Sequence, residues 1–119
     1  MARHNFKKLN IWIDRVKFVS LNYEFTKAFP KSETFILTSQ MNRSAVSISS
    51  NIAEESSKAT NKHFKAFLKH SLGSAFEWKI QLEIAKNEAY VGIDTYEKMI
   101  KEIQSLQKRI GSFIDKLTS

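Results

Sequence analysis

The sequence predicts an all-α protein, an antiparallel up-down-up-down four-helix bundle. Apolar residues recur at spacings of three and four in four long segments, polar or breaking residues separate these segments, and turn residues are scarce. The 119 residues include a single proline, Pro30, and three glycines, Gly73, Gly92 and Gly111. An all-β domain of this length needs many more turn residues, whereas long helices need few. The length fits one domain over residues 1–119.

The first predicted helix, residues 6–29, carries two apolar rows on neighbouring faces. The first row consists of Leu9, Trp12, Ile13, Val16, Val19, Tyr23 and Thr26. The second row consists of Ile11, Phe18, Leu21 and Phe25. One bundle partner cannot cover so wide an apolar arc. Either this helix lies centrally in the bundle, or the second row is an oligomer interface that contacts another subunit.

The second predicted helix covers residues 33–54 and follows a break at Pro30. Proline lacks a backbone donor and disfavours helix at the residue before it, so the first helix ends near Phe29. We expect Ser32 to cap the second helix, with Glu33 placed favourably at its positive end. The apolar row of this helix is Leu37, Met41, Ala45, Ile48 and Ile52.

Two further helices are predicted over residues 61–90 and 95–117. The third has a broad apolar surface, and we expect a neighbouring helix to approach it closely at Gly73, because glycine inside a helix otherwise costs about 1 kcal/mol relative to alanine. The fourth begins with Asp94 and Glu97 in the spacing of a capping box. Its apolar row is Tyr96, Ile100, Ile103, Leu106, Ile110, Phe113 and Leu117.

The chain is basic, with a formal net charge of +7. Much of this charge lies in residues 1–31, where seven Lys and Arg face only Asp14 and Glu24. A basic stripe that could follow a nucleic-acid backbone consists of Arg3, Lys7, Lys8, Arg15, Lys17, Lys62, Lys65 and Lys69. No base-reading motif accompanies the stripe. The alternative interpretation is the solvated surface of a basic protein.

A polar row lies beside the apolar row of the second predicted helix. It consists of Gln40, Arg43, Ser47, Asn51 and Glu54. Since buried polar groups must be paired, we interpret this row as a polar network between helices or subunits, with Glu77 as the partner of Arg43. The alternatives are a contact surface for a ligand or nucleic acid, and a solvated face.

The sequence offers no residue for catalysis, metal or cofactor binding. His63 and His70 are seven residues apart and do not have the spacing of a zinc helix. No Glu-x-x-His pair, glycine-rich phosphate loop or serine elbow is present. The chain has no cysteine, no apolar run long enough for a membrane span, and no signal-type segment after its basic first residues. We therefore expect a cytoplasmic protein that is not an enzyme and that has no membrane partner.

Several motifs resemble the four-helix-bundle proteins encoded in intervening sequences of bacterial 23S rRNA genes. Two lie near the start, Phe6-x-x-Leu9-x-x-Trp12 and Phe29-Pro30-x-x-Glu33-x-Phe35-x-Leu37. The longest is Gln40-Met41-x-Arg43-Ser44-Ala45-x-Ser47-Ile48-x-x-Asn51-Ile52-Ala53-Glu54. Two more are Phe64-x-x-Phe67-Leu68 and Gly73-Ser74-x-x-Glu77. The chain departs from the family at Glu55, where the family usually has a glycine that closes the helix.

The resemblance implies a bundle that assembles as a ring-like homopentamer. It also implies likeness to accessory proteins of diversity-generating retroelements, which are thought to bind nucleic acid and a reverse transcriptase. Two functional hypotheses follow. The protein is a homo-oligomer that binds RNA or DNA through a basic surface, or it is a protein-interaction scaffold that recruits a nucleic-acid enzyme such as a reverse transcriptase.

Overall fold

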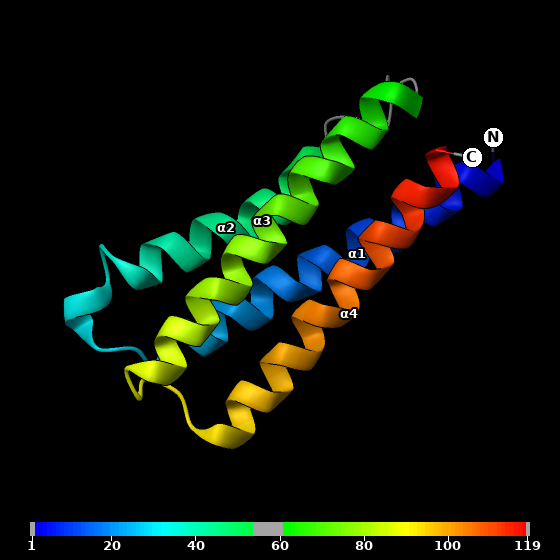
Figure 1. Cartoon of the computed structure of the whole chain (residues 1–119). Helices are drawn as coiled ribbons and strands as arrows, with labels where there is room; N and C mark the ends of the chain where they lie inside the picture. The colour runs from blue at the N-terminus through cyan, green and yellow to red at the C-terminus, as the bar shows by residue number, and fades with distance from the viewer. Residues whose placement is uncertain (1, 54–60, 119) are drawn as a thin grey trace.

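The computed structural model describes the backbone of residues 2–53 and 61–118, and the side chains of residues 14–49 and 62–117. All regular structure in these residues is helical, which confirms the predicted all-α class. Four long helices run alternately up and down in an elongated bundle of 46 × 24 × 18 Å (Figure 1). They are α1 (Ala2–Thr26), α2 (Leu37–Ala53), α3 (Asn61–Asn87) and α4 (Ile93–Thr118), with a short 3-10 turn, η1 (Lys31–Glu33), before α2.

The four helices do not pack equally tightly against one another. The α2–α3 pair has the most extensive contact, followed by α3–α4 and α1–α2, while α1 and α4 touch least. Within the described residues α1 and α3 share no close backbone contact, so these two helices lie diagonally across the bundle. In none of the helices described does an apolar stretch of membrane-spanning length occur.

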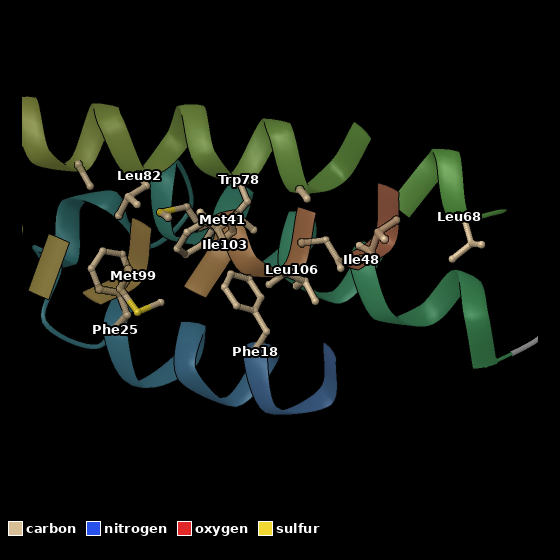
Figure 2. Close-up of a cluster of buried hydrophobic side chains, with 14 of the residues drawn as sticks. Phe18, Phe25, Met41, Ile48, Leu68, Trp78, Leu82, Met99, Ile103 and Leu106 are labelled. Carbon is tan, nitrogen blue, oxygen red and sulfur yellow. The ribbon is translucent and has the colours of Figure 1, made fainter. Parts of the chain in front are cut away.

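The core is centred on Trp78 of α3, which is fully buried (Figure 2). The ring of Phe18 packs edge-on against the indole with 4.7 Å between ring centroids, a favoured geometry for aromatic pairs. Met41 from α2 and Ile103 from α4 lie in the same cluster and are also inaccessible to solvent. Each of the four helices therefore contributes side chains to one continuous core.

The second apolar row of α1 faces the core and not another subunit, while the first row is divided, with Thr26 buried and Val19 packed against the core. Phe18 and Phe25, predicted to form an oligomer interface, are buried in the core of the single chain. Val16 and Tyr23, from the other row, are 40% and 44% exposed. The expectation failed because the inward face of α1 also carries polar residues, which made it look less apolar than the outward face.

The second helix begins later than predicted. Ser32 does not cap it, because Lys31–Glu33 form a 3-10 turn in which the amide of Glu33 donates to the carbonyl of Pro30. The α-helix starts at Leu37, whose amide donates to the Glu33 carboxylate at 3.3 Å. Glu33 thus supplies the side-chain acceptor that Ser32 was expected to supply. The predicted end of this helix at Glu54, and Glu55 in place of glycine, lie outside the described residues.

The boundary between α3 and α4 also differs from the prediction. The α3 helix ends at Asn87, and Ala89 then adopts a left-handed conformation with φ of 62°. The amide of Tyr90 donates to the carbonyl of Ala85, and that of Ala89 to Lys86, which is the hydrogen-bond pattern of a Schellman turn. The α4 helix already begins at Ile93, so Asp94 lies within its first turn and is not the cap residue expected there.

Gly73 does not mark a close approach between helices. Apart from its two chain neighbours and the adjoining backbone of its own helix, no residue has an atom within 4 Å of the position that a Cβ would occupy there. The residue is exposed on α3. It lines a surface groove between α2 and α3.

Candidate nucleic-acid interface

A groove of about 780 Å³ runs along the surface between α2 and α3. Its walls mix cationic, amide and hydroxyl side chains, with aliphatic side chains toward the carboxyl end of α3. It is lined by Gln40, Arg43, Ser44 and Ser47 from α2, and by Lys69, His70, Gly73, Ser74, Glu77, Ile80, Gln81 and Ile84 from α3.

Small hydroxyl residues hold the two helices together beneath this groove. The hydroxyls of Ser47 and Ser74 share a hydrogen bond of 2.8 Å, which joins α2 to α3. Deeper in the interface, the Ser71 hydroxyl donates to the carbonyl oxygen of Ile48 at 2.7 Å. Because serine is short, its hydroxyl can reach across only when the helices lie close together. These contacts give the groove a rigid base.

The structure brings four members of the predicted polar network together in this groove. Gln40, Arg43 and Glu77 are exposed there and Ser47 is half-buried, whereas Asn51 and Glu54 have no described side chain. Within the described side chains, no ion pair joins Arg43 to Glu77, although both line the groove. Both charged groups are therefore available to a ligand in the groove. The described residues contain no cluster of His, Asp and Glu that could hold a metal ion.

The predicted basic stripe does not form one continuous surface. Lys62 and Lys69 are exposed on α3 and Lys65 is half-buried there, and their spacing of three and four residues places them along one side of the helix. Lys17 is exposed on α1 and lines a smaller groove against α4. Since α1 and α3 lie diagonally, Lys17 cannot extend the surface formed on α3. Side chains of Arg3, Lys7 and Lys8 lie outside the described residues.

Arg15 is not on the surface at all. Its side chain is fully buried, and none of its three guanidinium nitrogens has a hydrogen-bond partner in the part of the chain that the structure describes. Arg15 shares the inward face of α1 with Phe18 and Asn22, at spacings of three and seven. Its place in an apolar row was the sequence signal that could have indicated burial.

The surroundings of Arg15 disfavour its charge. Burial lowers the pKa of its guanidinium from its ordinary value to about 9, the negative charge of Asp14 opposes this shift, and the positive charge of Arg109 adds to it. Asp14 forms its ion pair with Arg109 of α4 and not with Arg15. The pair links α1 to α4 across the loosest contact in the bundle.

A buried polar cluster that was not predicted from the sequence joins three helices. The Asn22 side chain of α1 accepts a hydrogen bond from the indole N–H of Trp78 on α3 at 2.8 Å. Its amide group donates to Asn42 Oδ1 on α2 at 2.7 Å. The Thr26 hydroxyl lies 3.3 Å from the same Asn42 oxygen. The available signal was Asn22 itself, which lies four residues after Phe18 and three before Phe25.

Two groups of apolar side chains remain exposed on different sides of the bundle. The first, which we term the α1/α2 face, consists of Val16, Tyr23, Phe35 and Val46. The second, which we term the α3 face, consists of Phe76, Ile80 and Ile84. Phe35 is 92% exposed, although phenylalanine is commonly buried. Of the other predicted interface residues, Leu21 is half-buried against the core and the Ile11 side chain lies outside the described residues.

These features define a four-helix-bundle protein with a polar groove and a cationic side on α3. The model of the family described as 23S rRNA-intervening sequence protein matches residues 7–112, and the chain belongs to this family. A crystal structure from Bacteroides thetaiotaomicron VPI-5482, of a protein of unknown function from the S23 ribosomal protein family, has the same fold. It superposes with a TM-score of 0.82 at 22% identity, over 92% of this chain and 98% of the other. No match is found among curated proteins.

Proposed function

We propose that this protein is a non-enzymatic homo-oligomer, located in the cytoplasm, that binds RNA or DNA through the cationic side of α3 and the adjoining groove. The observation that carries the proposal is the concentration of positive charge there. Lys62, Lys65 and Lys69 lie along one side of α3, and Arg43 and His70 continue the polar surface into the groove. Glu77 is the single acidic residue among those lining the groove.

The geometry of these lysines suits a phosphate backbone. From Lys62 to Lys69 the helix rises about 10 Å, so the three ammonium groups are spread along the helix and can contact successive phosphates of one strand. Lysines bound to phosphates release condensed counterions, and this release drives binding without requiring a particular base sequence. The absence of a base-reading motif in the sequence agrees with such a mode of binding.

The exposed apolar residues support assembly with further copies of the chain. The α1/α2 face and the part of the α3 face at Phe76, which does not line the groove, lie on different sides of the bundle, so contact between them joins two copies head to tail. Head-to-tail contacts that close on themselves produce rings. The resemblance to intervening-sequence proteins implies a pentamer, and we propose this stoichiometry for the chain.

Fluorescence anisotropy with labelled RNA and DNA at about 50 mM and about 200 mM salt tests nucleic-acid binding. We expect affinity to fall steeply with salt, and we expect Lys62→Gln with Lys69→Gln to reduce both the affinity and its salt dependence. The matched control is Lys98→Gln with Lys101→Gln, which removes the same charge from exposed positions on α4. Failure to bind at the lower salt concentration would refute the proposal, as would equal losses in the two double variants.

The second candidate function is a scaffold that recruits a nucleic-acid enzyme such as a reverse transcriptase. The observation that favours it is Phe35, which stands almost fully exposed beside Tyr23 and Val46 along a shallow surface depression. An exposed aromatic residue among apolar neighbours is typical of binding hot spots. Affinity capture with and without nuclease treatment separates the two functions, because a directly recruited protein remains bound after the nucleic acid has been digested.

A further inference from the structure

We propose that the groove between α2 and α3 holds a single strand of RNA or DNA and reads a base edge with Gln81 and Glu77. This inference rests on the proposed nucleic-acid binding, and it specifies the form of nucleic acid and the side chains that contact its bases. The groove places cationic residues and hydrogen-bond acceptors next to each other along α3. A nucleic-acid strand carries the complementary groups, because its phosphates can bind the cationic residues and the N–H groups of its bases can donate to the acceptors.

The basic residues of the groove lie toward the amino end of α3. Lys69 and His70 line the groove on the α3 side, and Arg43 lines it on the α2 side. Arg43 also borders the depression on the other side of α2, so its side chain stands at the rim between the two surfaces. A phosphate at this rim can contact a cation from each helix.

The acceptors lie farther along the same helix. Glu77 and Gln81 are four residues apart and therefore neighbours on one side of α3. The Oε1 atom of Gln81 is buried and has no hydrogen-bond donor among the described residues. A buried acceptor without a donor is unfavourable, so this oxygen favours a ligand that brings an N–H group. The Glu77 carboxylate, which forms no ion pair with Arg43, presents a second acceptor beside it.

The distance between the two parts of the groove leaves room for a nucleotide. Lys69 and Glu77 are separated by eight residues, or about 12 Å along the helix. Gly73 lies between them, and no atom of a neighbouring helix comes within 4 Å of its Cβ position. The absence of a side chain there opens the floor of the groove. A phosphate held by Lys69 can thus direct its base past Gly73 toward Glu77.

The groove distinguishes a single strand from a duplex. Adjacent helices pack with their axes about 8–10 Å apart, and the depression between them admits one strand with its bases. In a duplex the Watson–Crick edges are already paired, whereas an unpaired strand presents them to side chains. The Glu77 and Gln81 acceptors prefer bases with an exocyclic amino group. Cytosine has such a group, whereas thymine and uracil present carbonyl oxygens in its place.

The test compares binding of labelled oligo(dC), oligo(dT), oligo(rC) and a mixed-sequence duplex, each of about 12 nucleotides, by fluorescence anisotropy. We expect the full-length protein to bind oligo(dC) about tenfold more tightly than oligo(dT) or the duplex. The oligo(rC) sample shows whether the 2′-hydroxyl adds affinity, which separates an RNA site from a DNA site.

Two variants assign the preference to the groove. Gln81→Leu and Glu77→Leu remove the acceptors, and we expect each to bring the affinity ratio of oligo(dC) to oligo(dT) close to one. Gln104→Leu and Glu102→Leu make the same changes at exposed positions on α4 and should keep the ratio. Circular dichroism of each variant establishes that it remains folded.

The outcomes separate this inference from the function on which it rests. If no oligonucleotide binds at low salt, both fail. If binding occurs but the duplex binds as tightly as oligo(dC), or if the two acceptor variants keep the preference of the wild type, the groove is not the base-contacting site. The proposal that the cationic side of α3 binds nucleic acid would stand in that case.

Discussion

Trp78 and Asn22, one on each of two diagonal helices, are joined through the core by a hydrogen bond of 2.8 Å from the indole N–H to the asparagine oxygen. Both side chains are completely inaccessible to solvent. Asn22 also donates to Asn42, so this single residue of α1 connects to both α3 and α2. A buried polar group is tolerated when it is paired, and here the pairing fixes how three helices align.

Substitution of Asn22 by leucine should destabilise the protein by about 1–3 kcal/mol, because it leaves the indole N–H of Trp78 buried without an acceptor. Urea unfolding followed by circular dichroism measures the change in the free energy of unfolding. The double variant with Trp78→Phe, which also lacks the donor, should lose less than the sum of the two single variants. Strict additivity would show that the pair is not coupled.

The α1 helix shows how far the sequence can determine the core. A helix with a 3.6-residue period was predicted over residues 6–29, and the structure has it over Ala2–Thr26, so it begins four residues earlier and ends three residues earlier than predicted. The orientation of the helix was predicted wrongly, because Arg15 and Asn22 interrupt the row that faces inward. Periodicity shows which residues share a helix face, but it does not show which face is buried when the buried face is partly polar. The contacts of α1 with α2 and α3 decide which of its faces is buried, and such tertiary contacts cannot be read from the pattern of one segment.

The groove illustrates a similar limit. The sequence indicated a polar row on the second helix and lysines on the third, but as separate features. Close packing through Ser47 and Ser74 combines them into one surface. Arg43 and Glu77 were predicted to form a pair, and they do lie along one groove. The polar contact that joins α2 to α3 there is the hydrogen bond between Ser47 and Ser74, and not an ion pair between Arg43 and Glu77.

Arg15 should be a source of instability near neutral pH. A buried charge without a partner carries a desolvation cost that an apolar side chain of similar length avoids. We expect Arg15→Met to stabilise the protein by about 1–4 kcal/mol at pH 7. Urea unfolding measures this change. The control is Arg109→Met, which removes an arginine that is exposed and paired with Asp14, and which should not stabilise the protein.

The same residue predicts a dependence on pH. Burial lowers the pKa of Arg15 in the folded protein to about 9, whereas in the unfolded chain the pKa keeps its ordinary, higher value. Above about pH 9 the unfolded state therefore binds more protons than the folded state, and the contribution of Arg15 makes stability rise with pH. The stability advantage of Arg15→Met over wild type should shrink between pH 8 and pH 10. An advantage that stays constant would show that the buried group does not titrate.

Ala89 offers a substitution that should stabilise the connection between α3 and α4. Its φ of 62° lies in the left-handed region, which L-residues other than asparagine and aspartate rarely adopt. Glycine has no such penalty, so Ala89→Gly should raise the free energy of unfolding by about 0.5–1 kcal/mol. The same change at Ala66, an exposed residue within α3, should lower it by about 1 kcal/mol. Thermal unfolding of the two variants, followed by circular dichroism, should therefore show shifts of opposite sign.

The two exposed apolar faces predict how copies of the chain associate. Tyr23→Lys on the α1/α2 face and Phe76→Lys on the α3 face should each reduce the oligomeric mass measured by light scattering, because a charge is buried without a partner. Gln104→Lys, on the exposed side of α4, adds the same charge and should leave the mass unchanged. Phe18→Lys should instead unfold the chain, since Phe18 lies in the core.

Mixing the two interface variants distinguishes head-to-tail contact from twofold contact. The Tyr23→Lys protein keeps an intact α3 face and the Phe76→Lys protein keeps an intact α1/α2 face, so one undamaged contact can form between them. If the contact is head to tail, the mixture should yield dimers that neither variant forms alone. If each face instead pairs with itself, the mixture should contain only species that the separate variants already form. That result would exclude the ring, because a ring requires two different complementary faces on every copy.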